Sequence, residues 1–501
     1  MTGTAQALMA IVVPVAFAVF LGGDTGSWLA LSGAGLVLLV AAIMGVVSAL
    51  TTTYRLTPQH LQISRGLLSR SARAVALDRI RSVDVTAKPV HRLLGLATLT
   101  IGTGGNYAGV ETRPTRLDGL PAPEAEELRR ALLPTTAEVS RLAGAEPAAS
   151  TAATDAPSDA GAGAAREELV RLDWRWLRYA PLSITGLTAL WLVVSSLLQT
   201  ADDLRRSDVG KTWLREAAQW TDGWATWQFL ALAMVLVAVV GSVGSLAVFA
   251  EGWWGFTLHR EPAGSATGTL RSRRGLLTTR SSSLEEARLR GVEFRQPLSL
   301  RWAQVASLRA IATGLKRSGD GFGGGPAVLL PPVPLSITQE VARGVLHEVT
   351  SPLANVAWQR HPRAALRRRL ARAITVPALA AGCVALTGLP SAWWLAVAVL
   401  ALLTGWVAVD GYASLAHHLR DGYLLVRRGS LVRSSVALQD RAVIGFRISS
   451  SPSQRRAGLC TLTATTAAGA GGVKVTDLAA QDALPLARVV VPGLLEQFLD
   501  G

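Results

Sequence analysis

Arginine is the residue whose abundance and spacing indicate the clearest chemistry in this chain. Its guanidinium group binds carboxylates and phosphates through charge-assisted hydrogen bonds. Basic residues gather near the N-terminus, in a triplet around residue 272 and in the run HPRAALRRRLAR at 361–372. The candidate anion-binding residues are Arg65, Arg70, Arg73, Arg79, Arg81, Lys88, Arg92, Arg271, Arg273, Arg274, Arg367, Arg368 and Arg369.

No arrangement of side chains typical of an enzyme active site is found in the sequence. The glycine-rich stretches 102–105 and 319–325 lack the Gly-Lys-Ser/Thr ending of a phosphate-binding loop, so they are interpreted as hairpin turns. His417 and His418 are adjacent and would point about 100° apart on a helix. The two cysteines are not at metal-ligand spacing, and no disulfide is expected. We expect no enzymatic activity, no cofactor and no metal site.

Apolar segments dominate the rest of the chain and must position these arginines. Half of the 501 residues are hydrophobic and only 17% are charged, which is unusual for a soluble protein. Uniformly apolar runs of this length are typical of transmembrane helices. For the first run, a cleaved signal peptide is the alternative, but it lacks a basic N-terminal region. The six runs span 5–21, 28–50, 177–198, 227–250, 374–389 and 391–409, in three pairs.

The distribution of positive charge predicts the orientation of these hairpins in the membrane. All but four of the 50 Lys and Arg lie in the long segments outside the short connectors. Because positive segments remain on the cytoplasmic side, we expect a multi-pass protein of the inner (plasma) membrane with its N-terminus and long segments in the cytoplasm. Tryptophans at the ends of the runs are expected at the headgroup layer: Trp28, Trp174, Trp176, Trp227, Trp253, Trp254, Trp393 and Trp394.

A β-rich pattern occurs three times, at 54–103, 255–314 and 421–469. Landmark spacings recur, since Pro89 precedes Gly95 by six residues just as Pro452 precedes Gly458. A recurring period marks one structural unit used several times. Alternating apolar residues predict strands, and an amphipathic stretch after them predicts a closing helix.

The predicted organisation has eight segments. Residues 134–168 are poor in large apolar side chains, which indicates a flexible linker. The segments are hairpin 1 (5–50), β-unit 1 (51–133), the linker (134–168), hairpin 2 (174–250), β-unit 2 (251–350), a basic juxtamembrane segment (358–373), hairpin 3 (374–410) and β-unit 3 (411–501).

Three motifs of the first copy resemble a known family. Arg65-Gly66-Leu67-Leu68, Leu77-Asp78-Arg79-Ile80 and Gly95-Leu96-Ala97-Thr98-Leu99 are similar to the bacterial pleckstrin-homology-like domain of YdbS and YdbT type membrane proteins. Three hairpins, each followed by such a unit, resemble the larger, YdbT-type member. The later copies depart from the pattern, with Trp302-Ala303-Gln304 in place of Leu94-Gly95-Leu96.

The resemblance implies a fold but names no ligand. It implies a seven-stranded bent sheet with a C-terminal helix in each copy. The expected fold class is therefore an α+β membrane protein with six transmembrane helices in three hairpins, each followed by a small cytoplasmic pleckstrin-homology-like β-barrel or sandwich with a C-terminal helix.

The expected function is that of an integral membrane scaffold or interaction protein. Its partners would be anionic membrane lipids, a smaller pleckstrin-homology-like membrane protein of the same family, or a second copy of the chain. The resemblance implies a link to envelope stress or antimicrobial resistance. No nucleic acid is expected, because inside-positive loops explain the net charge of +15 and no stacking aromatics line the basic strands.

Three alternatives stay open at this point. The hairpins could form a transporter of lipid or small molecules, although only Asp410 places an ionisable side chain near the end of a run. An enzyme acting on lipid headgroups is the second, for which no acid-base pair is found. The third concerns the arginines themselves: those at 363–372 could serve only to orient the hairpin, and the others could form a solvated surface.

Overall fold

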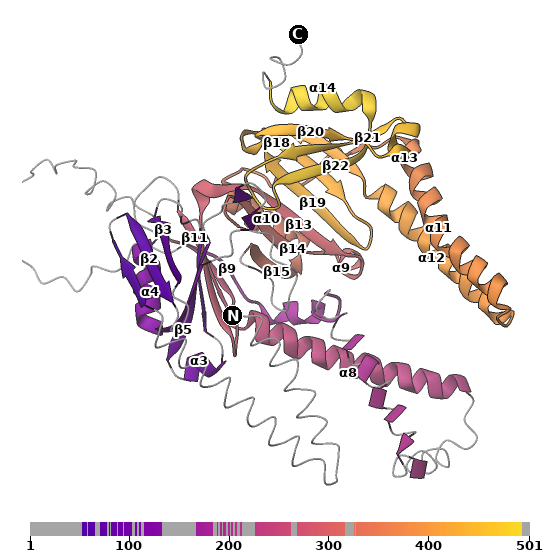
Figure 1. Cartoon of the computed structure of the whole chain (residues 1–501), viewed down its shortest axis with the longest axis horizontal. Helices are drawn as coiled ribbons and strands as arrows, with labels where there is room; N and C mark the ends of the chain where they lie inside the picture. The colour runs from indigo at the N-terminus through magenta and orange to yellow at the C-terminus, as the bar shows by residue number, and fades with distance from the viewer. Residues whose placement is uncertain are drawn as a thin grey trace, which may run out of the picture.

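The computed structural model describes residues 53–132 and 167–492, with gaps at 66–70, 103–105, 112–114, 262–267 and 316–324, shorter ones elsewhere, and only scattered positions within 184–225. Three β-rich units and the long helices that leave two of them make up this part of the chain (Figure 1). The predicted hairpin at 5–50 and nearly all of the predicted linker at 134–168 lie outside the described residues.

The first unit consists of two three-stranded sheets, a short two-stranded sheet and a closing helix. Alternation of buried and exposed residues, as in Leu61, Gln62 and Ile63, forms strands with one face on a core. The elements are β1 (Thr53–Leu56), β2 (His60–Arg65), β3 (Ser71–Ala76), β4 (Ser82–Ala87), α3 (Pro89–Leu93), β5 (Leu96–Gly102), β6 (Asn106–Tyr107), β7 (Val110–Glu111), β8 (Thr115–Pro121) and α4 (Ala122–Leu132).

The second unit contains seven strands and the closing helix α10, the number that the family resemblance implies. Its elements are β9 (Glu167–Arg171), η2 (Trp174–Tyr179), α8 (Thr226–Trp253), β10 (Thr257–Glu261), β11 (Thr269–Arg274), β12 (Thr279–Glu285), η3 (Glu286–Arg288), β13 (Leu289–Pro297), α9 (Leu298–Trp302), β14 (Val305–Ala312), β15 (Val328–Pro334) and α10 (Leu335–Leu346).

The third unit repeats this order. Its elements are β16 (Gln359–Arg360), α11 (Arg363–Thr387), α12 (Ala392–Ala413), β17 (Ala416–Arg420), β18 (Tyr423–Arg428), β19 (Val432–Gln439), η4 (Asp440–Ala442), β20 (Gly445–Ser449), α13 (Pro452–Arg456), β21 (Leu459–Thr465), β22 (Gly472–Ala479) and α14 (Ala480–Val490).

The long apolar helices are inserted between the first and second strands of the second and third units. β9 precedes α8 and pairs with β10, which follows it; β16 precedes the α11–α12 hairpin and pairs with β17. The boundaries predicted at 251 and 411 therefore leave out the first strand of each unit. Two short polar segments gave no strong strand signal, and only pairing to a distant strand satisfies their backbone groups.

Strand pairing joins the three units edge to edge. β4 of the first unit pairs with β12 of the second, and β13 of the second unit pairs with β19 of the third. Each pairing turns two small sheets into one seven-stranded sheet, in the orders β8-β5-β4-β12-β11-β10-β9 and β15-β14-β13-β19-β18-β17-β16. We call these pairings the first and second joints. The sequence repeats predict separate units, whereas the structure shows one continuous array.

Apolar packing accompanies the second joint. One hydrophobic core contains Val292 and Phe294 of the second unit together with Leu425 and Ala437 of the third. The same core includes Phe249 and Trp253 from the end of α8. Units two and three and the end of this helix therefore share one core.

Three described helices are long and apolar enough to cross a membrane: Met234–Trp253 within α8, α11 and α12. They correspond to the fourth, fifth and sixth predicted runs. Most of the third run falls in the region where only scattered positions are described, and the first two runs lie outside the described residues. The predicted basic juxtamembrane segment is largely the first part of α11, which begins at Arg363.

The closing helix of the third unit forms despite Pro485, which weakens a helix prediction from sequence. Ala483, Leu486, Ala487 and Val490 are buried on one face of α14. Burial of this face against the third core stabilises the helix by more than the hydrogen bond lost at the proline.

Gly291 tests the second joint. A Cβ built there would lie 2.1 Å from the carbonyl oxygen of Ala437 on the neighbouring strand. We expect Gly291→Ala to destabilise the detergent-solubilised full chain by about 2 kcal/mol, because overpacking a strand pairing forces backbone shifts. Thermal unfolding measures it. Gly445→Ala, at the same position of a strand with an open edge, is the control, and equal losses for both would contradict the pairing.

Candidate functional site

The thirteen candidate basic residues do not form one site. Four of them, Arg70, Arg79, Arg81 and Lys88, lie outside the described residues, and only the backbone is described for Arg65 and Arg73. Arg273 and Arg367 are exposed. The others, Arg92, Arg271, Arg274, Arg368 and Arg369, contact other parts of the protein.

Arginines of both units hold the first joint together. Arg271 pairs with Glu126 of α4 at 2.9 Å, and Arg92 donates to the carbonyl oxygen of Leu276 at 2.6 Å. Arg129 of α4, in the first unit, donates to Ser283 of the second unit at 2.9 Å. These contacts cross between the units on both sides of the β4–β12 pairing.

Arg274 and one carboxylate oxygen of Asp84 are buried at this joint. Burial raises the pKa of Asp84 to about 6, and burial lowers the pKa of Arg274 to about 9. The Arg274 guanidinium carbon lies 4.4 Å from the centre of the Trp253 ring. Arg274 thus contributes to the junction between the joint and the end of α8, and it does not face a lipid surface.

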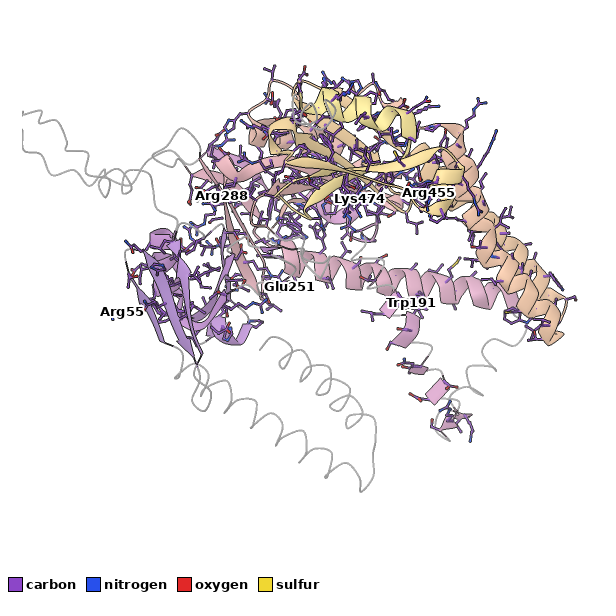
Figure 2. All side chains as sticks on the ribbon, turned by 45° about the horizontal axis from the view of Figure 1, so that its top comes forward. Arg55, Trp191, Glu251, Arg288, Arg455 and Lys474 are labelled. Atoms are coloured by element: carbon purple, nitrogen blue, oxygen red, sulfur yellow. The ribbon has the colours of Figure 1, made fainter. Side chains whose placement is uncertain are left out.

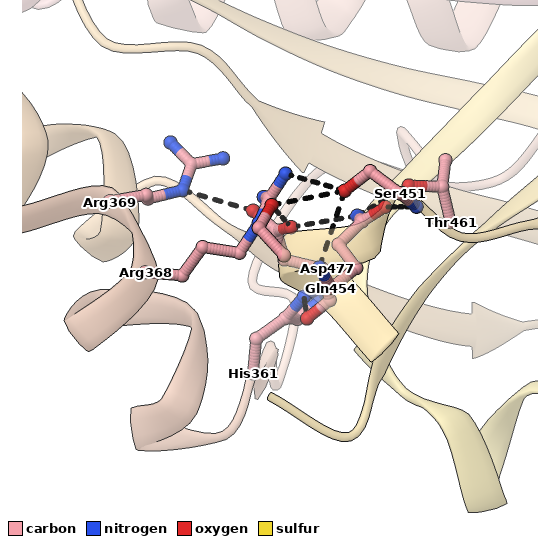
Figure 3. A network of polar contacts seen from close by, with 8 residues as sticks. His361, Arg368, Arg369, Ser451, Gln454, Thr461 and Asp477 are labelled. Carbon is pink, nitrogen blue, oxygen red and sulfur yellow. Dashed lines mark hydrogen bonds and ion pairs between the residues drawn. The ribbon is translucent and has the colours of Figure 1, made fainter. Parts of the chain in front are cut away.

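Asp477 is the centre of a polar network that holds the start of α11 on the third unit (Figure 3). Its carboxylate pairs with Arg368 at 2.5 Å and with Arg369 at 3.2 Å, and it accepts from Gln454 at 3.0 Å. The side chain of Asp477 is nearly fully buried, and its backbone has a positive φ of 59°. Arg368 and Arg369, which precede the fifth apolar run, are therefore part of a structural ion-pair network.

A second ion pair fixes the other helix of this hairpin. Arg301 of α9 donates two hydrogen bonds to Asp410 near the end of α12, at 2.7 and 3.0 Å. Ser430 also donates to Asp410, at 3.1 Å. Asp410, near the end of the sixth apolar run, thus serves as an anchor to the second unit, while Asp477 anchors the hairpin to the third. Figure 2 shows Arg455 of α13 near the point where α11 and α12 leave the third unit.

Between these two anchors lies a cavity of about 300 Å³ lined by three arginines. Arg295 comes from β13, Arg428 from the end of β18 and Arg369 from α11. Glu293 is the single carboxylate in the lining, and Ser434 donates to it at 2.5 Å. The remaining lining residues are Gly429, Val432 and Thr476. We call this the arginine cavity; its three guanidinium groups against one carboxylate favour an anionic ligand.

The arginine cavity lies beside the ends of α11 and α12 that meet the third unit. The β18–β19 turn next to it contacts α12, because Ser430 donates to the carbonyl oxygen of Val407 at 3.0 Å. Leu431 at the tip of that turn and Trp302 of α9 are 57% and 78% exposed. Large apolar side chains beside arginines at the end of a membrane helix suit the interface between headgroups and acyl chains.

The tryptophans near α8 divide into two groups. Trp174 and Trp254 are exposed and stack edge to face at 4.7 Å. Trp176 and Trp253 are buried in the core of the second unit, so the prediction that they lie at the headgroup layer is wrong for these two. Near the end of α8, packing against the second unit therefore decides which tryptophan rings are buried and which are exposed.

Two of the three arginines of the cavity, Arg295 and Arg428, were missed from sequence, whereas Arg369 was among the candidates. Arg295 and Arg428 follow the apolar part of β13 and β18 at their polar ends, a pattern that indicates only a solvated face. Their convergence depends on the second joint, which pairs β13 with β19. An acidic residue recurs eleven positions before Gly95 and Gln304, and in the second unit this residue is Glu293, which lines the cavity.

His361 and His417 form a buried pair under the third unit. His417 Nδ1 lies 3.2 Å from His361 Nε2, and His361 Nδ1 lies 3.1 Å from the carbonyl oxygen of Asp477. Because that carbonyl can only accept, His361 carries its proton on Nδ1 and accepts from His417. Burial lowers the pKa of His361, and burial together with the charge of His361 and His418 lowers the pKa of His417 to about 4.

Removing the charge of Asp477 should release α11. We expect Asp477→Asn to destabilise the full chain by about 3 kcal/mol or more, since breaking a buried pair leaves Arg368 and Arg369 without a counter-charge. Asparagine tolerates the positive φ, so the backbone is preserved. Thermal unfolding and the rate of tryptic cleavage at 367–369 are the measurements. Asp482→Asn, exposed on α14, is the matched control; a loss no larger than the control's would contradict the network's role.

The histidine pair should make stability depend on pH. The folded pKa of His417, about 4, lies below its ordinary 6.5, so its contribution is complete above 6.5 and is lost as the pH falls toward 4, where the unfolded chain takes up the proton first. We expect the thermal midpoint of the wild type to fall more steeply between pH 7 and 5 than that of His417→Gln. Parallel curves would show that the pair does not control this window.

Comparison with known proteins identifies two parts of the chain. Residues 9–136 and 373–490 match the family of the bacterial PH domain. Each match covers a predicted membrane hairpin together with the β-unit that follows it, while the second unit repeats the same fold outside both matches. Neither curated proteins nor solved structures give a match. The two matched segments are thus similar to the bacterial PH domain.

Proposed function

We propose that this chain is an integral membrane scaffold whose three PH-like units form one array on the cytoplasmic side and bind an anionic lipid headgroup in the arginine cavity. The observation that carries the proposal is the convergence of Arg295, Arg369 and Arg428 beside the ends of two apolar helices. The array and its joints support a role in holding positions relative to the bilayer, not one in chemistry.

The geometry explains why a headgroup fits better than a soluble anion. The exposed Leu431 and Trp302 beside the cavity would enter the acyl region, which brings the arginines to the level of phosphates. Each basic group near an anionic leaflet contributes about 1 kcal/mol of attraction. Arg369 is held by Asp477, so its guanidinium is already positioned before a ligand arrives.

Partner binding and physiological role go further than headgroup binding. A smaller PH-like protein of the same, YdbS and YdbT, type is the proposed partner class, and a place in envelope stress or antimicrobial resistance is a hypothesis that depends on the family resemblance. We also propose that the chain is not an enzyme. Within the described residues, no group of three His, Cys, Asp or Glu side chains is placed to hold a metal ion.

Headgroup binding is tested on the full chain in a neutral detergent. Titration with dihexanoyl phosphatidylglycerol should show saturable, salt-sensitive binding, measured by calorimetry, and dihexanoyl phosphatidylcholine should bind more weakly. Arg295→Gln and Arg428→Gln should each weaken binding roughly fivefold, because each removes about 1 kcal/mol of attraction.

Arg488→Gln is the matched control, since Arg488 is exposed on α14 and does not line the cavity. It should bind like the wild type. Equal affinity for both headgroups, or binding unchanged in Arg295→Gln and Arg428→Gln, would rule out the arginine cavity as the site.

A further inference from the structure

Two of the edge strands, β3 and β20, are the equivalents of strands that form the joints. Within the part of the chain that the structure describes, β3 pairs only with β2, and β20 pairs only with β21. The equivalents of β3 in the other units are β12 and β19, and the equivalents of β20 are β4 and β13. These four strands are the ones that make the two joints. The edges of β3 and β20 are therefore the two halves of a third joint, which stays open among the described residues.

Both joints use one register, so the missing joint can be read from them. Asp84, Glu293 and Arg447 each lie eleven residues before a residue of positive φ: Gly95, Gln304 and Gly458. On the partner strands, Ser282 and Val436 each lie seven residues after the turn glycines Gly275 and Gly429. Asp84 pairs with Ser282, and Glu293 pairs with Val436.

The first unit supplies Arg73 at the position of Ser282 and Val436, seven residues after Gly66. If β20 of one copy paired with β3 of another in the same register, Arg447 would lie opposite Arg73. Like charges directly opposite each other in an antiparallel pair are destabilising. The register therefore disfavours head-to-tail assembly of identical chains.

Charge at this position changes sign between the closed joints and the open edge. In both closed joints the strand equivalent to β20 carries a carboxylate, Asp84 or Glu293, and that carboxylate is buried. In β20 it carries Arg447, which is exposed. An arginine on an open edge can also serve simply to prevent aggregation. Ile444 and Ile448 beside it are 65% and 50% exposed, however, and an edge that is only protected would not need two large apolar residues.

We propose that the β20 edge binds the edge strand of a different protein that carries Asp or Glu opposite Arg447. The partner would be a PH-like unit with an acidic residue seven positions after its turn glycine, and it would extend sheet β20-β21-β22 as β19 extends the sheet of the second unit. This proposal deepens the proposed scaffold role. It does not need the arginine cavity, so the two can fail separately.

A charge swap in the full chain provides a partner of known chemistry. The variant Arg73→Glu, Arg447→Glu carries glutamate at both ends, so its β3 edge offers a carboxylate to Arg447 of the wild type. Neither protein should associate with itself, since equal charges meet in each case. In a detergent free of anionic lipid, a mixture of the two should associate at least tenfold more tightly than either alone, as measured by light scattering after size exclusion.

Register is checked by cross-linking. The same alignment places Ser449 of β20 opposite Ser71 of β3, as Arg295 lies opposite Ser434 in the second joint. With Cys383→Ser throughout, wild type carrying Ser449→Cys should form a disulfide with the swapped chain carrying Ser71→Cys. Arg447→Gln in the wild-type partner should weaken association, whereas Arg488→Gln should not.

Two results would overturn the proposal. One is a mixture that associates no more tightly than its separate components. The other is wild type that cross-links Ser449→Cys to Ser71→Cys on its own as efficiently as the mixture does, which would show head-to-tail assembly of identical chains. Circular dichroism of each variant confirms folding, and both substituted positions lie on open edges.

Discussion

The backbone hydrogen bonds between β4 and β12 and between β13 and β19 fix the position of every other part of this protein. A PH-like unit alone leaves strand edges with unpaired donors and acceptors, and such edges pair with whatever strand is available. Here the available strand belongs to the next unit. Six residue pairs close the first joint and seven close the second. Three repeats therefore become one array, and the register of these pairings sets the contacts between its units.

Burial at the joints is costly and selective. Asp84 and Glu293 are removed from water at the two joints, and the raised pKa of Asp84 expresses the cost of burying its charge. Such groups contribute little net stability, but they oppose wrong pairings, because a misplaced carboxylate would meet an apolar strand or another carboxylate. The hydroxyl of Ser434 donates a hydrogen bond to the Glu293 carboxylate, which gives one of the two groups a partner. The same position in each unit thus decides which edges can meet.

The long apolar helices are attached to this array by burial and by ion pairs. α8 ends inside the core of the second unit through Phe249 and Trp253. The α11–α12 hairpin is held between Asp477 of the third unit and Arg301 of the second. Because the second joint lies between these anchors, the arginine cavity forms only when both units and the hairpin are in place. A ligand in that cavity would sense the arrangement of all three.

Sequence alone determined the repeated unit, its β-rich character and the apolar runs, because alternation, spacing and hydropathy are local properties. The turn glycines and the motif around Gly95 could be aligned by counting. Tertiary structure decided what local patterns do not encode. It showed that Gln359–Arg360 and Glu167–Arg171 are the first strands of units whose remaining strands follow long apolar helices. It also showed that Arg368 and Arg369 face Asp477, while Arg295 and Arg428 face a cavity. An arginine has the same sequence pattern in an ion pair, in a cavity or in water. Only the strand register, set by pairing over long distances in the chain, distinguishes them.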